Sequence, residues 1–68
     1  MCLGQAILYI DNKQSQFMIE CANQSILGVK QGNFTVCKRF GDERLQGDVL
    51  NTEIEQFSVY NNMIVIIV

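Results

Sequence analysis

The residues of this chain with the widest range of chemistry are its three cysteines, Cys2, Cys21 and Cys37. A cysteine thiolate is both a nucleophile and a metal ligand. The chain contains no His, which excludes Ser–His–Asp and Cys–His catalysis, imidazole metal sites and a histidine pH switch. No two cysteines form a C-x-x-C pair, and this absence argues against a zinc finger or a thioredoxin-like site.

Cys2 is the candidate metal ligand. Initiator methionine is commonly removed before a small second residue, so we expect the mature chain to begin with Cys2. Its α-amine and its thiol would then chelate a metal together, and two such chelates on a two-fold axis would supply two sulfurs and two nitrogens. That donor set suits Ni(II) or Cu(II), and binding should weaken at low pH because both donors must lose protons. The alternative is an incidental small residue at a frayed terminus.

The other polar residues indicate no catalytic site. Cys21 and Cys37 fall in apolar segments, where a free cysteine behaves as a small hydrophobe. The acidic residues are spread along the chain, whereas a hard-cation site needs several oxygens from one loop. No nucleophile has a candidate base and no glycine-rich phosphate loop is present, so we expect a protein that is not an enzyme.

A basic cluster is the one hint of nucleic-acid binding. Lys38, Arg39 and Arg44 flank the polar pair Asp42-Glu43, and small β-barrels do bind nucleic acids. The net charge of −2 argues against it, because contacts to phosphate supply most of the non-specific affinity. A metal-free barrel that binds RNA or another protein stays open as an alternative function.

Length and composition predict one small folded domain over residues 1–68. Apolar residues make up 49% of the 68 residues and charged residues 18%, which is typical of a folded chain. A domain of roughly 60 residues buries only about 60% of its unfolded surface, so reinforcement by a partner chain is expected.

The expected location is the cytoplasm. The N-terminus lacks a secretory signal and the cysteine count is odd. The longest apolar run, Met63–Val68, has six residues, whereas a membrane-spanning helix needs about 20. We therefore expect a soluble protein without membrane contact.

Regularly spaced turn signals separate short runs of strand-forming residues, and no segment is assigned a helical period. A helical or 3₁₀ turn is expected only near residues 48–52. The pattern predicts an all-β fold, a small SH3-like barrel of short antiparallel strands. The expected strands are 5–10, 16–21, 25–30, 34–40, 44–46, 53–60 and 63–68, with Ala6, Leu8 and Ile10 on one face of the first and a hairpin turn at 31–33.

The last two strands form the clearest local signal. Asn61-Asn62 suits a two-residue turn, which predicts a hairpin with Tyr60 opposite Met63, Val59 opposite Ile64 and Phe57 opposite Ile66. The terminal run has no polar face, so both of its sides must be covered. The cover is either a second subunit or a central position within the monomer's own barrel.

Four short motifs, taken in order and spacing, resemble a known family. They are Met1-Cys2, Phe40-Gly41-Asp42-Glu43, Leu45-Gln46-Gly47-Asp48-Val49 and Asn62-Met63-Ile64-Val65. The chain is similar in these motifs to the CooT family, small nickel-binding accessory proteins associated with carbon monoxide dehydrogenase. The resemblance implies a small β-barrel, a homodimer and a metallochaperone that binds Ni(II) at Cys2, with one cysteine from each subunit.

The chain departs from that family after its second expected strand. The family tends to carry an acidic stretch there, whereas this chain has Cys21-Ala22-Asn23-Gln24. The opening Met1-Cys2-Leu3-Gly4 is also similar to the HypC hydrogenase maturation chaperones. That family continues with Pro-Gly and this chain with Gln5-Ala6, so a HypC-like chaperone is the second alternative.

Overall fold

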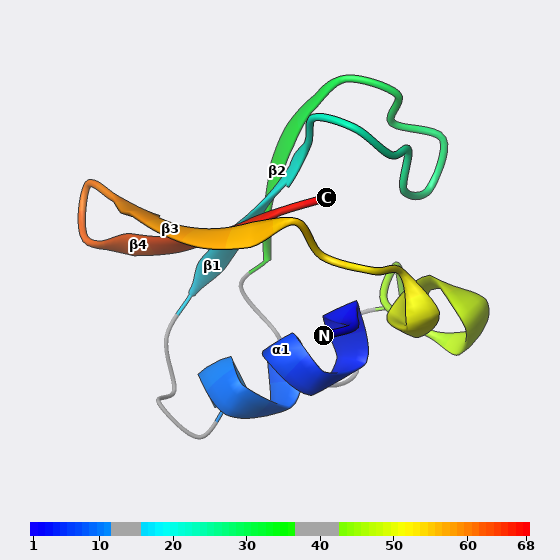
Figure 1. The fold of residues 1–68 in the computed structure, drawn as a ribbon, viewed down its shortest axis with the longest axis horizontal. Helices are drawn as coiled ribbons and strands as arrows, with labels where there is room; N and C mark the ends of the chain where they lie inside the picture. Colours follow the sequence, from blue (N-terminus) through cyan, green and yellow to red (C-terminus); the bar gives the residue numbers. More distant parts are fainter. Residues whose placement is uncertain (12–15, 37–42) are drawn as a thin grey trace.

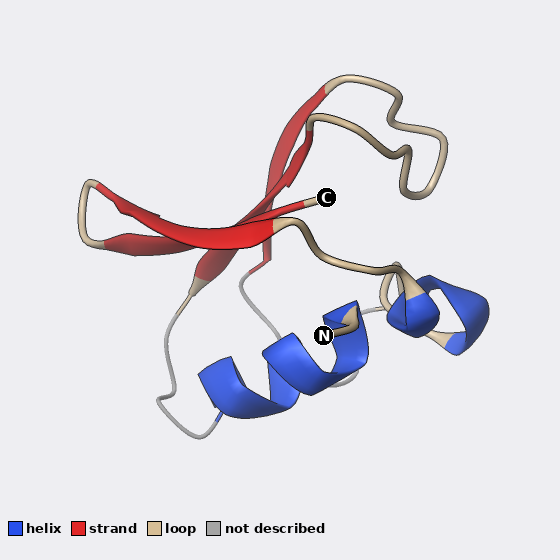
Figure 2. Cartoon of the chain, in the orientation of Figure 1, coloured by secondary structure: helices blue, strands red, loops and turns tan. Residues whose placement is uncertain are grey.

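The computed structural model of the chain describes residues 1–11, 16–36 and 43–68. A four-stranded sheet in the order β2-β1-β4-β3 forms one layer, and the helix α1 lies across one side of it with the 3₁₀ helix η1 beside its first turn (Figure 1). Figure 2 shows the same arrangement by element type. In chain order the elements are α1 (Leu3–Asp11), β1 (Phe17–Cys21), β2 (Gly32–Val36), η1 (Gly47–Asn51), β3 (Gln56–Tyr60) and β4 (Met63–Ile67).

The first element is a helix, so the strand expected over residues 5–10 is wrong. A strand would place Leu8 on the same face as Ala6 and Ile10, but in the structure Leu8 is exposed while the other two are buried. The physical reason is the spacing i, i+3, i+4, i+7, which forms one continuous stripe only on a helix. The buried residues of this stripe are Leu3, Ala6, Ile7 and Ile10.

The expected strand 16–21 is confirmed as β1. Phe17 and Ile19 are buried, and Met18 and Glu20 alternate with them at intermediate exposure. β2 pairs with β1 in antiparallel register, from Phe17 opposite Val36 to Cys21 opposite Gly32. This pairing involves a strand that begins at Gly32, two residues earlier than the expected strand 34–40. Residues 37–40 of that expected strand lie outside the described part of the chain.

The expected strand over residues 25–30, with its hairpin turn at 31–33, is wrong. Ile26 and Val29 exchange two backbone hydrogen bonds of 3.2 and 2.9 Å, which close a tight turn. The two residues inside that turn, Leu27 and Gly28, have φ angles of 56° and 82°. Leucine rarely adopts positive φ, so its type gives no turn signal and the sequence misplaces the turn.

The C-terminal hairpin is confirmed with its register. β3 and β4 pair with Tyr60 opposite Met63, Val59 opposite Ile64 and Phe57 opposite Ile66. Asn61 and Asn62 in the turn have φ angles of 51° and 62°, as a type I′ hairpin requires.

The segment between β2 and β3 is partly as expected. The helical turn expected near residues 48–52 is confirmed as η1. The strand expected over residues 44–46 is wrong, because the backbone turns there and inserts Leu45 into the core. Gly4 lets α1 approach η1 closely, since a Cβ on Gly4 would lie 3.2 Å from the Leu50 carbonyl oxygen.

The sheet is mixed and open, which corrects the expected barrel of antiparallel strands. β4 pairs antiparallel with β3 and parallel with β1, and the described strands end at β2 and β3 without closing. The small β-rich fold is as expected. β4 has a central position, with a strand paired along each of its edges. Its side chains alternate between the two faces of the sheet, where Ile66 is fully buried on the helix side and Val65 is 6% exposed on the other.

The core lies between α1 and the sheet. Residues paired across strands share a face, so Ile19, Ile66 and Phe57 point to the same side. Ile19 and Ile66 are completely buried beneath the helix, but Phe57 on the outermost strand is partly exposed. The helix therefore covers the middle of this face and leaves its β3 end open.

Candidate metal centre at Cys2

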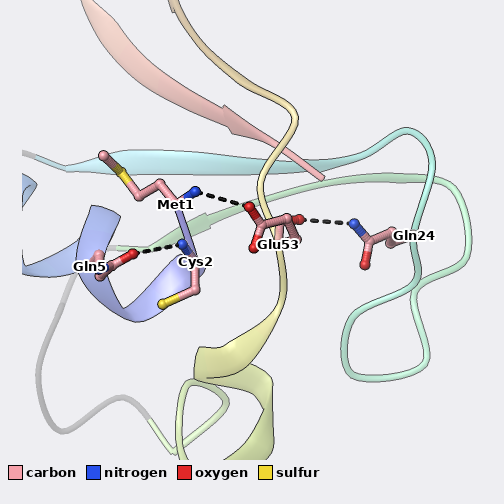
Figure 3. A network of polar contacts seen from close by, with 5 residues as sticks. All are labelled: Met1, Cys2, Gln5, Gln24 and Glu53. Atoms are coloured by element: carbon pink, nitrogen blue, oxygen red, sulfur yellow. Dashed lines mark hydrogen bonds and ion pairs between the residues drawn. The ribbon is translucent and has the colours of Figure 1, made fainter.

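Cys2 forms the N-cap of α1. Its carbonyl oxygen accepts the first helical hydrogen bond, from Ala6 N at 3.1 Å. Its own backbone N–H donates to the Gln5 side-chain oxygen at 3.0 Å, which is the reciprocal half of a capping box (Figure 3). Both backbone polar groups of Cys2 are thus used, and they fix the residue against the first helical turn.

A segment from the other end of the chain holds Cys2 from the side. Residues 1–3 pair with residues 52–54 in a short antiparallel bridge centred on Cys2 and Glu53. Leu3 N donates to Thr52 O at 2.8 Å and Ile54 N donates to Met1 O at 3.0 Å. The backbone of Cys2 is therefore fixed on two sides although it lies at the start of the chain.

Glu53 binds the chain's terminal ammonium group. The Met1 ammonium donates to Glu53 Oε1 at 2.9 Å, and both side chains are largely exposed. The Gln24 side-chain amide donates to the Glu53 carbonyl oxygen at 2.8 Å, which fixes the backbone of Glu53 (Figure 3). The Glu53 carboxylate therefore lies beside the N-terminal nitrogen of the chain.

The Cys2 side chain borders an open groove of about 320 Å³ between α1 and η1. Cys2 is a free cysteine and the residue is half-buried at this position. The groove is mainly apolar and is lined by Cys2, Gly4, Gln5, Ile7, Leu8, Leu45, Leu50 and Asn51.

The arrangement brings few metal-binding side chains together. Within residues 1–11, 16–36 and 43–68, no three His, Cys, Asp or Glu side chains form a group that could hold a metal ion. Glu53 is the acidic residue paired with Cys2 in the backbone bridge. One chain therefore offers the Cys2 thiol, a backbone or terminal nitrogen and a neighbouring carboxylate.

Those of the remaining sequence candidates that the structure describes do not line the Cys2 groove. Cys21 is only 1% exposed and packs in the core, as expected for a small hydrophobe. Cys37, Lys38, Arg39 and Asp42 lie outside the described residues. Arg44 is exposed and donates to the Thr35 carbonyl oxygen at 3.3 Å, which covers part of the outer edge of β2.

Sequence reasoning missed two neighbours of Cys2. Gln5 carries a usable signal, because a polar residue three positions after an N-cap is the mark of a capping box. Glu53 carries no such signal in the sequence. It lies beside Cys2 because residues from the two ends of the chain pair with each other.

Comparison of the chain with models of protein families, with curated proteins and with solved structures finds no match. Neither described helix has the length and apolar character needed to cross a membrane.

Proposed function

We propose that this protein is a nickel-binding metallochaperone, an accessory protein for the maturation of a nickel enzyme such as carbon monoxide dehydrogenase. It binds Ni(II) at Cys2 across a homodimer, with one thiolate from each copy. The nickel is cargo for the client enzyme. The observation that supports this proposal is the fixed, half-exposed position of Cys2 at the start of α1, beside the terminal nitrogen of the chain.

Rigidity is the first property that a site at a chain terminus needs. Terminal residues are usually mobile, and ordering them on binding would cost affinity. Here the bridge to residues 52–54 and the helix cap order Cys2 before any metal arrives. The backbone that carries the thiol and the nitrogen is therefore already in place when the metal binds.

Removal of Met1 leaves most of this framework intact. It removes the ammonium–Glu53 ion pair and the hydrogen bond from Ile54 N to Met1 O. The bonds from Leu3 N to Thr52 O and from Ala6 N to Cys2 O use only atoms of Cys2 and later residues. Cys2 therefore keeps its place, and its nitrogen becomes the terminal amine opposite the backbone of Glu53.

The contact with Gln5 is compatible with metal binding. A primary amine uses its lone pair for the metal and keeps two N–H groups. One of them can still donate to the Gln5 side-chain oxygen, which accepts a 3.0 Å bond from the same nitrogen in the structure. Gln5 would orient the amine and the metal would be bound by Cys2.

The proposed nickel site needs two copies of the chain, because the Cys2 chelate of one copy supplies only one sulfur and one nitrogen. Ni(II) is commonly bound in a square-planar or tetragonal set of four N, O or S donors. Two chelates on a two-fold axis complete that set with the same residue from each copy. A site of this kind forms and breaks with the dimer, which suits a protein that must release its metal.

A Ni(II) titration of protein with a verified N-terminus tests the proposal. Thiolate-to-metal charge-transfer absorption and native mass should saturate at one metal per two chains, and Cys2→Ser should abolish both signals. A matched form that retains Met1 should bind more weakly, because its Cys2 nitrogen is an amide. Equal binding by Cys2→Ser, or no binding above buffer competition in the wild type, would refute the nickel site and favour the metal-free interaction module.

A further inference from the structure

We infer that a second copy of this chain docks in the apolar groove between α1 and the β3–β4 hairpin. This inference rests on the proposed function in one respect, because it names the surface that would bring two Cys2 residues together. The groove has a volume of about 390 Å³. It is lined by Met1, Tyr9, Phe57, Ser58, Val59 and Ile64.

The groove exists because α1 is shorter than the sheet face it covers. Phe57 and Val59 pair with Ile66 and Ile64, so all four side chains point to the helix side of the sheet. At the centre of that face Ile66 is buried, but at the β3 end Phe57 is 41% and Val59 72% exposed. The hairpin extends past the helix in Figure 1, which leaves part of a core-type surface in contact with water.

The apolar area of this groove is substantial for an interface. Tyr9 and Phe57 are 58% and 41% exposed, which is about 200 Å² together if an aromatic side chain offers about 200 Å². Val59 and the half-buried Ile64 add roughly 100 Å². A standard interface takes about 800 Å² from each partner, of which roughly 450 Å² is apolar. The groove thus supplies more than half of that apolar share without Met1.

The charge distribution favours an identical copy as the occupant. The chain has a net charge of −2, so two copies repel wherever acidic side chains would face each other. The side chains that line the groove include no acidic or basic group, and β3 itself reads Gln-Phe-Ser-Val-Tyr. A two-fold contact here places uncharged side chains on uncharged side chains, so it avoids that repulsion.

The backbone of Cys2 lies beside one end of this groove. Met1 lines that end and consecutive Cα atoms are about 3.8 Å apart, whereas Cys2 itself lines the other groove, between α1 and η1. After removal of Met1, Cys2 becomes the first residue at that end. A two-fold axis near this end of the groove brings the two Cys2 residues to one interface.

The test compares Val59→Asp with the matched control Leu27→Asp. Leu27 is another exposed large hydrophobic residue, at 45%, and its φ of 56° suits aspartate. Molar mass is measured by sedimentation across a concentration series, with and without Ni(II). We expect a wild-type dimer, a dissociation constant raised at least about tenfold by Val59→Asp, and no such change in Leu27→Asp. Circular dichroism checks folding, and Val59→Thr, which keeps the side-chain shape, should raise the constant in the same direction.

The outcomes separate this inference from the nickel proposal. A wild-type dimer with an unchanged dissociation constant in both Val59 variants overturns the groove as the interface and leaves nickel binding at Cys2 untouched. A dimer that depends on Val59 but binds no nickel supports the groove and refutes the metallochaperone. A wild type that stays monomeric at every concentration, with or without Ni(II), overturns the inference and assigns the groove to a different protein partner.

Discussion

Substitutions at Ile7 and Leu8 test whether residues 3–11 form the helix α1. Ile7 is 2% exposed and Leu8 is 55% exposed, and only a helix buries Ile7 together with Ala6 and Ile10. A strand would reverse this, with Leu8 inside beside Ala6 and Ile10, and Ile7 outside. The two neighbouring residues therefore report the secondary structure through the free energy of unfolding.

The expected magnitude follows from burial. Ile7→Ala removes three carbon atoms from the core, which costs about 2 to 5 kcal/mol when transfer and cavity effects are combined. A domain of 68 residues has a total stability of roughly 3 to 10 kcal/mol, so this variant could unfold. Ile7→Val, at about 1 kcal/mol, is the milder form, whereas Leu8→Ala should cost less than about 1 kcal/mol.

Urea denaturation followed by far-UV circular dichroism is the suitable assay, because the chain has no Trp. With a slope of about 1 kcal/mol per molar urea, Ile7→Val should lower the midpoint by about 1 M. All variants are measured at one protein concentration, since association adds to apparent stability. If Leu8→Ala destabilises the protein more than Ile7→Ala, residues 3–11 do not form this helix.

Three further substitutions probe local structure by the same urea assay. Asn62→Val places a β-branched residue at a φ of 62° and should cost about 1 to 2 kcal/mol, whereas Asn62→Gly should be close to neutral; equal effects would contradict the type I′ turn. Gln5→Ala removes the acceptor for Cys2 N and should cost about 0.5 to 1 kcal/mol, and no loss would show that the cap is dispensable. Glu53→Gln breaks an exposed ion pair and should cost less than about 1 kcal/mol, because the bond from Gln24 uses the Glu53 backbone; a larger loss would contradict this account.

Local signals predicted the parts of the fold that depend on neighbouring residues. The β3–β4 hairpin was predicted with its register, because Asn61-Asn62 and two flanking strand-forming runs lie within one short segment. The helical turn η1 was predicted near residues 48–52, directly after Gly47. These elements need no information from the rest of the chain.

The errors arise where periodicity or distant contacts decide the structure. No helical period was assigned to residues 3–11 and a strand was predicted over 5–10, although burial of the helical stripe against the sheet determines this element. The parallel pairing of β1 with β4 joins segments more than 40 residues apart, and no turn signal specifies it. Cys2 was chosen as a candidate by its residue type and its position directly after Met1, but its neighbour Glu53 follows from the long-range bridge.

The Cys2 site and the dimer groove share one structural element, so their functions should be coupled. Residues 52–54 hold Cys2 and continue directly into β3, which carries Phe57 and Val59. If nickel is bound by both copies, metal binding and dimerisation are linked, and each must strengthen the other by the same factor. Ni(II) should therefore lower the dimer dissociation constant, and Val59→Asp should weaken nickel binding although Val59 offers no metal ligand. Competition titrations with a chelator of known affinity measure this loss, and nickel affinity that is independent of both protein concentration and Val59 would show that each copy binds its metal alone.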